Sequence, residues 1–292
     1  TCNDSLYLND SIYLSNNSNF IFQHNNIRLG NRSGYSLDTY HNIGIGYNSG
    51  MFATGYNIAI GYLASVNPNN KYVISMGYFA GHNNQSQKSI AVGYQAGKDN
   101  QGQQSIAIGT DAGNNNQGKD SIAIGTDAGR YNIGLDSIAI GSFSQLGIEN
   151  KEGNNNVSIG SSSLKYLKNG KSNTCIGNNS GINILSGSNN VTIGETQNNI
   201  DETFNNMNNN VYIGSNIIGD NNRENEIIIG YDYNYKDNRN TIPVNIRDSN
   251  TLILGNDEIS KVFIPGFANL PTADPNVSGQ VYIDNGTVKI SL

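Results

Sequence analysis

The residue types that most often carry catalysis are few in this sequence and do not come together at a repeated spacing. Its 3 histidines, His24, His41 and His82, are scattered along the chain. No Ser/His/Asp or Cys/His set recurs at a fixed position, and no pair of carboxylates stands out as the acid and base of glycoside hydrolysis. We therefore predict that the chain is not an enzyme and needs no cofactor.

Metal and disulfide chemistry have equally little support. The 2 cysteines, Cys2 and Cys175, are expected to lie about ten repeats apart, too far to bond to each other. Asp111 and Asp127 are one repeat apart and are expected to stack. However, the chain has no calcium-type Gly-Gly-x-Gly-x-Asp repeat, and water and salt screen exposed carboxylates. We predict that the chain has no metal site.

A row of tyrosines is the most regular candidate binding feature. Each follows the glycine that ends an Ile-x-Ile-Gly-like tetrad in successive repeats, and the row is Tyr47, Tyr62, Tyr78 and Tyr94. At the spacing of neighbouring strands, such rings form an aromatic ladder. Two interpretations stay open. The row is either a ligand-binding stripe for a sugar, or a ladder that only stabilises one repeat on the next.

These tyrosines must be positioned by an internal repeat of about 16 residues. The tetrad Ile-Ala-Ile-Gly ends at Gly109, Gly125 and Gly141, and related tetrads occur from Ile27 to Gly255. The period is too short for a pair of helices and is typical of one coil of a parallel β-solenoid, also called a β-roll. About 14 such coils would stack into a rod roughly 60 to 70 Å long.

The tetrads also predict which side chains are buried. Ile106 and Ile108 are two residues apart, so in a strand they share one face, which we expect to be the core of the coil. The residue between them points the other way and is small in coil after coil, whereas a solvated face would carry larger polar residues. This column suggests a second buried face, where another backbone approaches closely. Its alanines, which we assign to an interface between chains, are Ala59, Ala91, Ala107, Ala123 and Ala139.

The composition favours an all-β repeat protein. Charged residues make up 14% of the chain, hydrophobic residues make up 36%, and glycine occurs 34 times, while strong helix formers are scarce. The net charge of −6 and the lack of a Lys/Arg run argue against nucleic acid as a partner. No apolar stretch is long enough for membrane insertion. The chain begins Thr-Cys-Asn, which suggests a processed product or a fragment.

Four segments differ in their pattern. Residues 1–30 hold short alternating pairs, expected to form lead-in strands, 31–194 hold the regular coils, and 195–256 hold degenerate coils with longer loops. In 257–292, two alternating runs around Asn285-Gly286 predict a C-terminal β-hairpin. The predicted fold class is all-β, a parallel β-solenoid followed by a hairpin.

The regular coils resemble a known family. The segment Ser105-Ile106-Ala107-Ile108-Gly109-Thr110-Asp111-Ala112, with its copies from Ser121 and Ser137, resembles the head repeat of trimeric autotransporter adhesins. The resemblance covers residues 42–194. It implies a left-handed parallel β-roll, a homotrimer of packed rolls and a head that binds host-surface ligands. The coil is longer than the usual one of that family, and its neck, coiled-coil stalk and membrane anchor are not recognisable here.

A second resemblance lies near the C-terminus. Residues 270–282 are similar to a C-terminal segment of structural proteins of phages and large DNA viruses. Together the two resemblances imply a structural fibre or spike on a virion surface or another extracellular site. Such a fibre would be a homotrimer, would contact other virion proteins, and would attach to a host-surface glycan or protein.

Three other functions stay open at this point. A bacterial trimeric adhesin head would continue into a coiled coil and a membrane barrel. A polysaccharide depolymerase tailspike would cleave surface glycans, with paired carboxylates that meet between subunits. An ice-binding solenoid needs a flat regular array, usually of Thr, and here the column of Thr110 and Thr126 spans only two coils.

Overall fold

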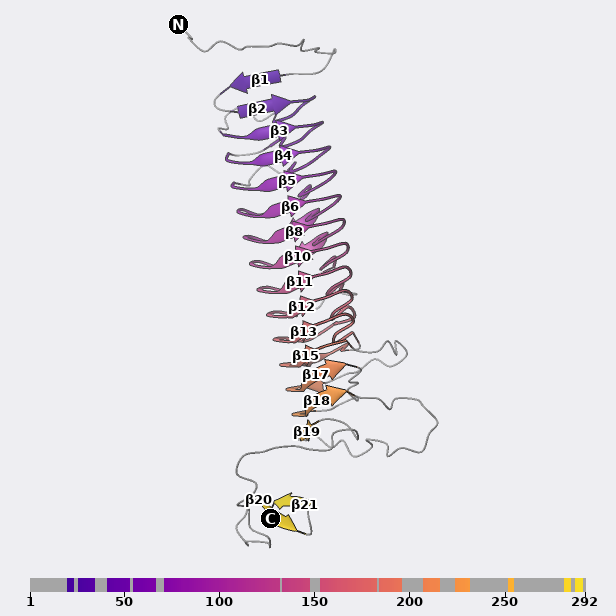
Figure 1. Cartoon of the computed structure of the whole chain (residues 1–292). Helices are drawn as coiled ribbons and strands as arrows, with labels where there is room; N and C mark the ends of the chain where they lie inside the picture. Colours follow the sequence, from indigo (N-terminus) through magenta and orange to yellow (C-terminus); the bar gives the residue numbers. More distant parts are fainter. Residues whose placement is uncertain are drawn as a thin grey trace, which may run out of the picture. The chain divides into compact units, whose positions relative to one another are not determined.

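A computed structural model of the chain consists of short strands joined by tight turns (Figure 1). The chain divides into two units, Thr1–Leu254 and Gly255–Leu292. Cys2, His24 and the lead-in pairs before Phe20 lie outside the described residues. The structure describes residues 20–23, 26–34, 41–52, 55–66, 71–131, 133–147, 153–182, 184–195, 207–215, 224–231, 252–254, 281–284 and 287–290, and no helix occurs in these ranges.

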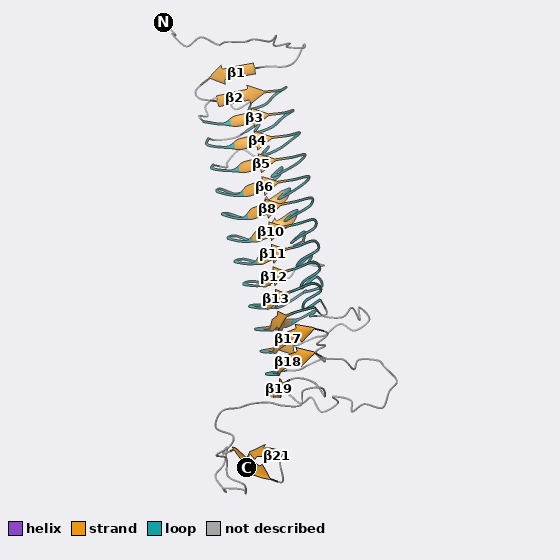
Figure 2. Cartoon of the chain, in the orientation of Figure 1, coloured by secondary structure: helices purple, strands orange, loops and turns teal. Residues whose placement is uncertain are grey.

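One 15-stranded sheet runs through the first unit, with its strands stacked coil on coil (Figure 2). After the first strand, each strand pairs in parallel with the strands of neighbouring coils, so the fold is the expected parallel β-solenoid. In sheet order the strands are β1 (Phe20–Gln23), β2 (Asn26–Leu29), β3 (Ile43–Ile45), β4 (Ile58–Ile60), β5 (Ile74–Met76), β6 (Ile90–Val92), β8 (Ile106–Ile108), β10 (Ile122–Ile124), β11 (Ile138–Ile140), β12 (Val157–Ile159), β13 (Thr174–Ile176), β15 (Val191–Ile193), β17 (Val211–Ser215), β18 (Ile227–Tyr231) and β19 (Leu252–Leu254).

The pairing register confirms a coil of about 16 residues. Ala107 of β8 lies opposite Ala91 of β6 and Ala123 of β10, so equivalent tetrads are aligned. The sheet continues through β17, β18 and β19, so the degenerate coils extend the same stack. The first strand differs, because β1 pairs antiparallel with β2.

Each tetrad ends at a corner that requires glycine. Gly109 has a φ of +129°, and a Cβ added to it would lie 2.6 Å from the carbonyl oxygen of Gly125 in the next coil. Both the backbone conformation and the neighbouring coil therefore exclude a side chain. This explains why the tetrad repeats its glycine.

A second set of parallel pairs lies on another side of the coils. An isolated parallel bridge between Asn83 and Asp99 extends this second set of pairs to the preceding coil. Exposed amides form a ladder there, because Asn84 Nδ2 donates to Asn100 Oδ1, and Asn100 Nδ2 donates to Asn116 Oδ1, both at 2.9 Å. The strands are β7 (Asp99–Gln101), which pairs with β9 (Asn115–Gln117), and β14 (Gly187–Ser188), which pairs with β16 (Met207–Asn208).

The structure reverses the predicted roles of the two strand faces. The small residues point into the coil, and Ala107 is 0% exposed within the single chain. The large residues point outward, and Ile108 is 38% exposed. The prediction that the isoleucines form the core of the coil is therefore wrong. The interface predicted for the small column is also wrong, because one chain already buries Ala59, Ala91, Ala107, Ala123 and Ala139.

The thinness of the coil explains this reversal. In the coils from β5 to β10, the opposite wall lies so close to the inner column of the main sheet that only small side chains fit in that column. A Cβ built on Gly113 lies 3.3 Å from the Cβ of Ala107 and 2.6 Å from Oε1 of Gln117. An isoleucine at position 107 would overlap the opposite wall at Gly113 and Gln117. Because side chains alternate along a strand, the isoleucines on either side of position 107 therefore point outward. One continuous buried cluster contains Ala80, Ala91, Ala96, Ala107, Ala112 and Ala123.

Buried amides tie each coil to the next. Asn42 Oδ1 accepts a hydrogen bond from the backbone N of Asn57, and Asn57 Oδ1 accepts one from the backbone N of Val73, both at 3.0 Å. Gln101 and Gln117 each donate from Nε2 to a strand carbonyl at 2.7 Å. Because a buried amide without partners is costly, these bonds allow so polar an interior. Several asparagines therefore lie in the interior rather than in exposed turns.

The interior changes toward the C-terminal end of the stack. Tyr212 and Ile228 occupy the inner column at 3% and 4% exposure, where earlier coils carry smaller residues such as Ala139 and Cys175. Tyr212 Oη donates to Oε2 of the buried Glu226 at 2.6 Å. Several coils here are longer, as the registers of β12 to β17 show. The apolar cluster that fills this part contains Leu164, Leu167, Cys175, Ile184, Met207, Tyr212 and Ile228.

The described part of the second unit is a pair of strands. Strand β20 (Val281–Asp284) pairs antiparallel with β21 (Thr287–Ile290). Asp284 lies opposite Thr287, which is the register of a two-residue connection. Most of the segment 270–282 lies outside the described residues.

Candidate interaction face

The outward face of the main sheet carries two columns of apolar side chains, which we call the outer apolar strip. In each strand, these are the residues on either side of the inner one, such as Ile106 and Ile108 in β8. From β2 to β18 the strip contains Ile, Val, Leu and Met, and Thr174 is its one polar residue among the described strands. No charged side chain lies in this part of the strip, so it is a continuous apolar surface.

The strip is large for a surface left in water. Monomeric proteins seldom expose one contiguous apolar patch larger than about 300–600 Å². The strip extends along every coil from β2 to β18. Because its backbone groups are already paired in the sheet, its side chains are what it offers to a partner. The members most exposed, at 37–42%, are Ile27, Leu29, Met76, Ile108, Ile176, Ile193, Ile213, Ile227 and Ile229.

The predicted tyrosine row forms a stacked ladder beside the strip. From Tyr47 through Tyr62 and Tyr78 to Tyr94, successive ring centroids are 5.3, 5.2 and 5.3 Å apart. Phe79 packs edge-on against Tyr62 and Tyr78. Because the rings cover one another's faces, a sugar ring has no space between them, and the ladder offers ring edges and hydroxyls. Ligand binding by these four tyrosines stays a prediction.

A second aromatic ladder, which the sequence did not lead us to predict, lies in the same coils. His41 stacks on Tyr56 with ring centroids 4.9 Å apart, and Tyr56 stacks on Tyr72 at 5.1 Å. Each of these residues lies two positions before the isoleucine that begins a strand, so the ladder borders the strip on the other side from Tyr47. The repeat period was the available signal, since Tyr56 and Tyr72 are one coil apart.

The aspartates that follow the tetrads have local partners. Asp127 Oδ1 lies 2.7 Å from Arg130 Nη1, and Asp111 Oδ1 accepts a hydrogen bond from Asn114 Nδ2 at 2.6 Å. Among the described residues, no group of three or more His, Cys, Asp or Glu side chains could hold a metal ion. These carboxylates therefore stabilise the turns in which they lie, Asp127 as an ion-pair partner and Asp111 as a hydrogen-bond acceptor.

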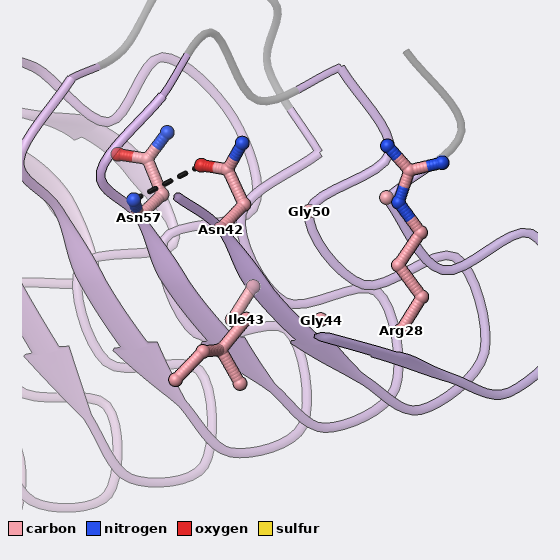
Figure 3. Close-up of a pocket in the computed structure, with 8 residues that line it drawn as sticks. Arg28, Asn42, Ile43, Gly44, Gly50 and Asn57 are labelled. Carbon is pink, nitrogen blue, oxygen red and sulfur yellow. Dashed lines mark hydrogen bonds between the residues drawn. The ribbon is translucent and has the colours of Figure 1, made fainter. Parts of the chain in front are cut away.

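The cavity drawn in Figure 3 is too small for an organic ligand. Its volume is about 10 Å³, which is space for about one water molecule. It lies among Arg28, Gly44 and the hydrogen-bonded pair Asn42 and Asn57. Arg28 stands opposite Gly44 in the inner column of the sheet. We interpret this cavity as the end of the coil interior. Arg28 occupies the inner-column position that small residues such as Gly44 and Ala59 occupy in the following coils.

The chain matches no protein-family model, no curated protein and no solved structure among those compared. Within the described ranges, no helix has the length and apolar character needed to cross a membrane. The outer apolar strip and the two ladders that border it are therefore the features on which a function can be argued.

Proposed function

We propose that the chain is a structural fibre or spike protein of a virion surface, that it assembles as a homotrimer through the outer apolar strip, and that it serves display and attachment to a host. The observation that carries this proposal is the strip, two uncharged columns of large apolar side chains, interrupted only by Thr174, in the described strands from β2 to β18. Water contact with apolar surface costs about 25 cal/mol per Å². Association of identical chains removes this cost along the whole stack.

The shape of the strip favours three parallel chains. Each three-residue strand contributes only two outward residues, such as Ile122 and Ile124, so the strip is long and narrow. Three narrow strips that face one axis cover one another fully. Parallel alignment keeps equivalent coils at the same height. The resemblance of residues 42–194 to trimeric autotransporter adhesin heads supports the same arrangement.

The coil stack suits an elongated display element. Backbone hydrogen bonds join every regular coil to its neighbours, as from Ile106 N to Ser121 O at 2.9 Å and from Gly109 N to Val92 O at 2.8 Å. Stacks of this kind are stiff along their length, since each coil contacts only its neighbours through many such bonds. The similarity of residues 270–282 to viral structural proteins favours a virion as the place of display.

Assembly is tested with two charges on the strip. Ile108→Asp combined with Ile124→Asp should leave the coils folded, because both positions face outward, while light scattering should show the mass of one chain instead of three. The control is Asn116→Asp, at an exposed position on the side of β9, which should remain a trimer. A wild-type protein that is monomeric at micromolar concentration would refute the proposal.

Display on a virion is tested separately. An antibody against the chain should label surface projections of purified particles, and purified trimers should bind host cells and compete with the particles. Particles without label would contradict the viral assignment and leave the assembly proposal in place.

A further inference from the structure

Two aromatic ladders border the outer apolar strip in the same coils. In the coil of β5, Tyr72 lies two residues before the outward Ile74, and Tyr78 lies two residues after the outward Met76. Tyr72 is 53% exposed and Tyr78 is 44% exposed. We call the two borders the N-side ladder, which contains His41, Tyr56 and Tyr72, and the C-side ladder, which contains Tyr47, Tyr62, Tyr78 and Tyr94.

In the coils from β8 to β17, neither border carries an aromatic residue. The place of Tyr72 is taken by Lys88 one coil later and by Asp120 three coils later, and the place of Tyr78 is taken by Thr126 three coils later. The backbone does not require aromatic residues, because φ is +63° at Tyr72, +60° at Lys88 and +55° at Asp120. Aromatic residues on both borders of the same coils therefore point to one shared partner.

We infer that in the assembled protein the N-side ladder of one chain packs against the C-side ladder of the next chain. This inference rests on the proposed function, since it needs the strips to face a common axis. Around such an axis, one border of each strip meets the opposite border of its neighbour, which is a heterologous contact that closes after three chains. Parallel chains bring the ladders to the same height.

The exposed ring surface is large enough for such a contact. The six tyrosines of the two ladders are 42–53% exposed. A tyrosine buries about 150–250 Å² when fully covered, so the ladders offer on the order of 500 Å² per chain. A stable interface buries about 800 Å² per partner, and the outer apolar strip supplies the remainder.

The rings are also held in place before they meet a partner. Phe79 packs edge-on against Tyr62 at 5.8 Å and against Tyr78 at 4.6 Å, between ring centroids. Stacking within each ladder fixes the rings further, so association costs little side-chain entropy. Tyrosine is enriched in the residues that dominate binding energy at interfaces, because it buries a large area with few rotatable bonds.

Disulfide trapping tests the contact directly. In a Cys2→Ser background, the double variant Tyr72→Cys with Tyr78→Cys should form covalent trimers on mild oxidation, seen on a non-reducing gel. The two positions lie on opposite sides of β5 (Ile74–Met76). Three extended residues already span roughly 10 Å, beyond the reach of a disulfide, so the two positions cannot bond within one chain. Each single variant should stay uncrosslinked, because a heterologous contact never brings a position to its own copy. The pair Asn84→Cys with Tyr78→Cys should also stay uncrosslinked, since Asn84 is exposed in the turn after β5, on the side of β7 and β9.

The outcomes separate this inference from the proposed function. Uncrosslinked chains that still run as trimers in light scattering would overturn the ladder contact and leave assembly through the strip intact. Crosslinking of a single variant would show an isologous contact and overturn the inference. A monomeric wild type would overturn both proposals.

A second measurement asks whether the rings contribute to association. Tyr56→Ser with Tyr72→Ser should weaken assembly about tenfold or more, measured as the concentration at which trimers dissociate. Tyr56→Phe with Tyr72→Phe should retain it. Unchanged assembly of the serine variant, with loss of binding to a glycan array, would instead assign the rings to a ligand.

Discussion

The coils from β5 to β10 and the coils from β12 to β18 fill their interiors in opposite ways. The first group, which we call the alanine coils, packs Ala107 and its neighbours against buried glutamines such as Gln117. The second group, the large-core coils, packs Leu164, Met207 and Tyr212 together. Yet the outer apolar strip continues along both groups, with Thr174 as its one polar residue among the described strands. The comparison indicates that the interior tolerates different fillings, while the outer face meets one requirement along its length.

The two interiors are also stabilised differently. An alanine buries little apolar area, so the alanine coils depend mainly on backbone hydrogen bonds and on amides such as Gln101. The large-core coils bury large side chains and gain more from the hydrophobic effect. Substitutions inside the two groups should therefore respond to volume in opposite directions.

The largest effect is expected from a cavity in the large-core coils. Leu164 is 0% exposed, and its Cδ2 lies 3.2 Å from a Cβ built on Gly181. Leu164→Ala should cost about 2–5 kcal/mol of unfolding free energy, measured by urea denaturation. Hydrogen exchange should show the large-core coils opening first. A loss below about 1 kcal/mol would mean that these coils are not held by apolar packing.

Enlarging a side chain in the alanine coils comes next. Ala107→Leu should cost about 1–3 kcal/mol, because the opposite wall leaves no space for added methylenes. Met207→Leu, a swap of similar volume in the large-core coils, should cost less than about 1.5 kcal/mol. Equal tolerance at both positions would contradict the thin interior that places the isoleucines outside.

A smaller and opposite effect is expected from a hydroxyl at the same position. Ser75 Oγ donates to Gln85 Oε1, whereas Gln117 Oε1, the equivalent atom in the coil of Ala107, is buried without a hydrogen-bond partner. Ala107→Ser should supply the missing donor and raise the unfolding free energy by about 1 kcal/mol, seen as a higher melting temperature.

The matched control for that substitution is Ala123→Ser. The side chain across from Ala123 is Ile133, whose Cδ1 lies 3.1 Å from a Cβ built on Gly129. No amide acceptor stands there, so the hydroxyl should bring no gain. Stabilisation at Ala123 equal to that at Ala107 would show that the glutamine is not the cause.

The smallest effect concerns the thiol of the large-core coils. Burial raises the pKa of Cys175 to about 12. The folded state therefore holds this proton more tightly than the unfolded state. The stability that the protonated thiol contributes is fully present below its ordinary pKa of about 9, and it is lost as the pH rises toward 12. At pH 9 the loss of unfolding free energy should stay below about 1 kcal/mol. The unfolding free energy of the wild type and of Cys175→Ala should be measured against pH, and the difference between the two curves separates the effect of the thiol from tyrosine ionisation. Identical curves would argue that the thiol does not titrate in this range.

Several features of this protein follow from local sequence rules alone. The coil length and the parallel stacking could be predicted because alternating apolar residues and a corner glycine recur at one period, and a glycine such as Gly109 permits a backbone that other residues avoid. The ladder from Tyr47 to Tyr94 could be predicted for the same reason, since equal phase in the repeat means equal position in the stack.

Only the tertiary structure decided which strand face is inside. A strand such as β8 has an apolar residue on both faces, Ala107 on one and Ile106 with Ile108 on the other, so its pattern is consistent with either arrangement. The choice depends on the distance to the opposite wall of the coil, where Gln117 and Gly113 approach Ala107 from later in the chain. That distance follows from how the whole coil closes, and side-chain volume then selects alanine for the interior and leaves isoleucine outside.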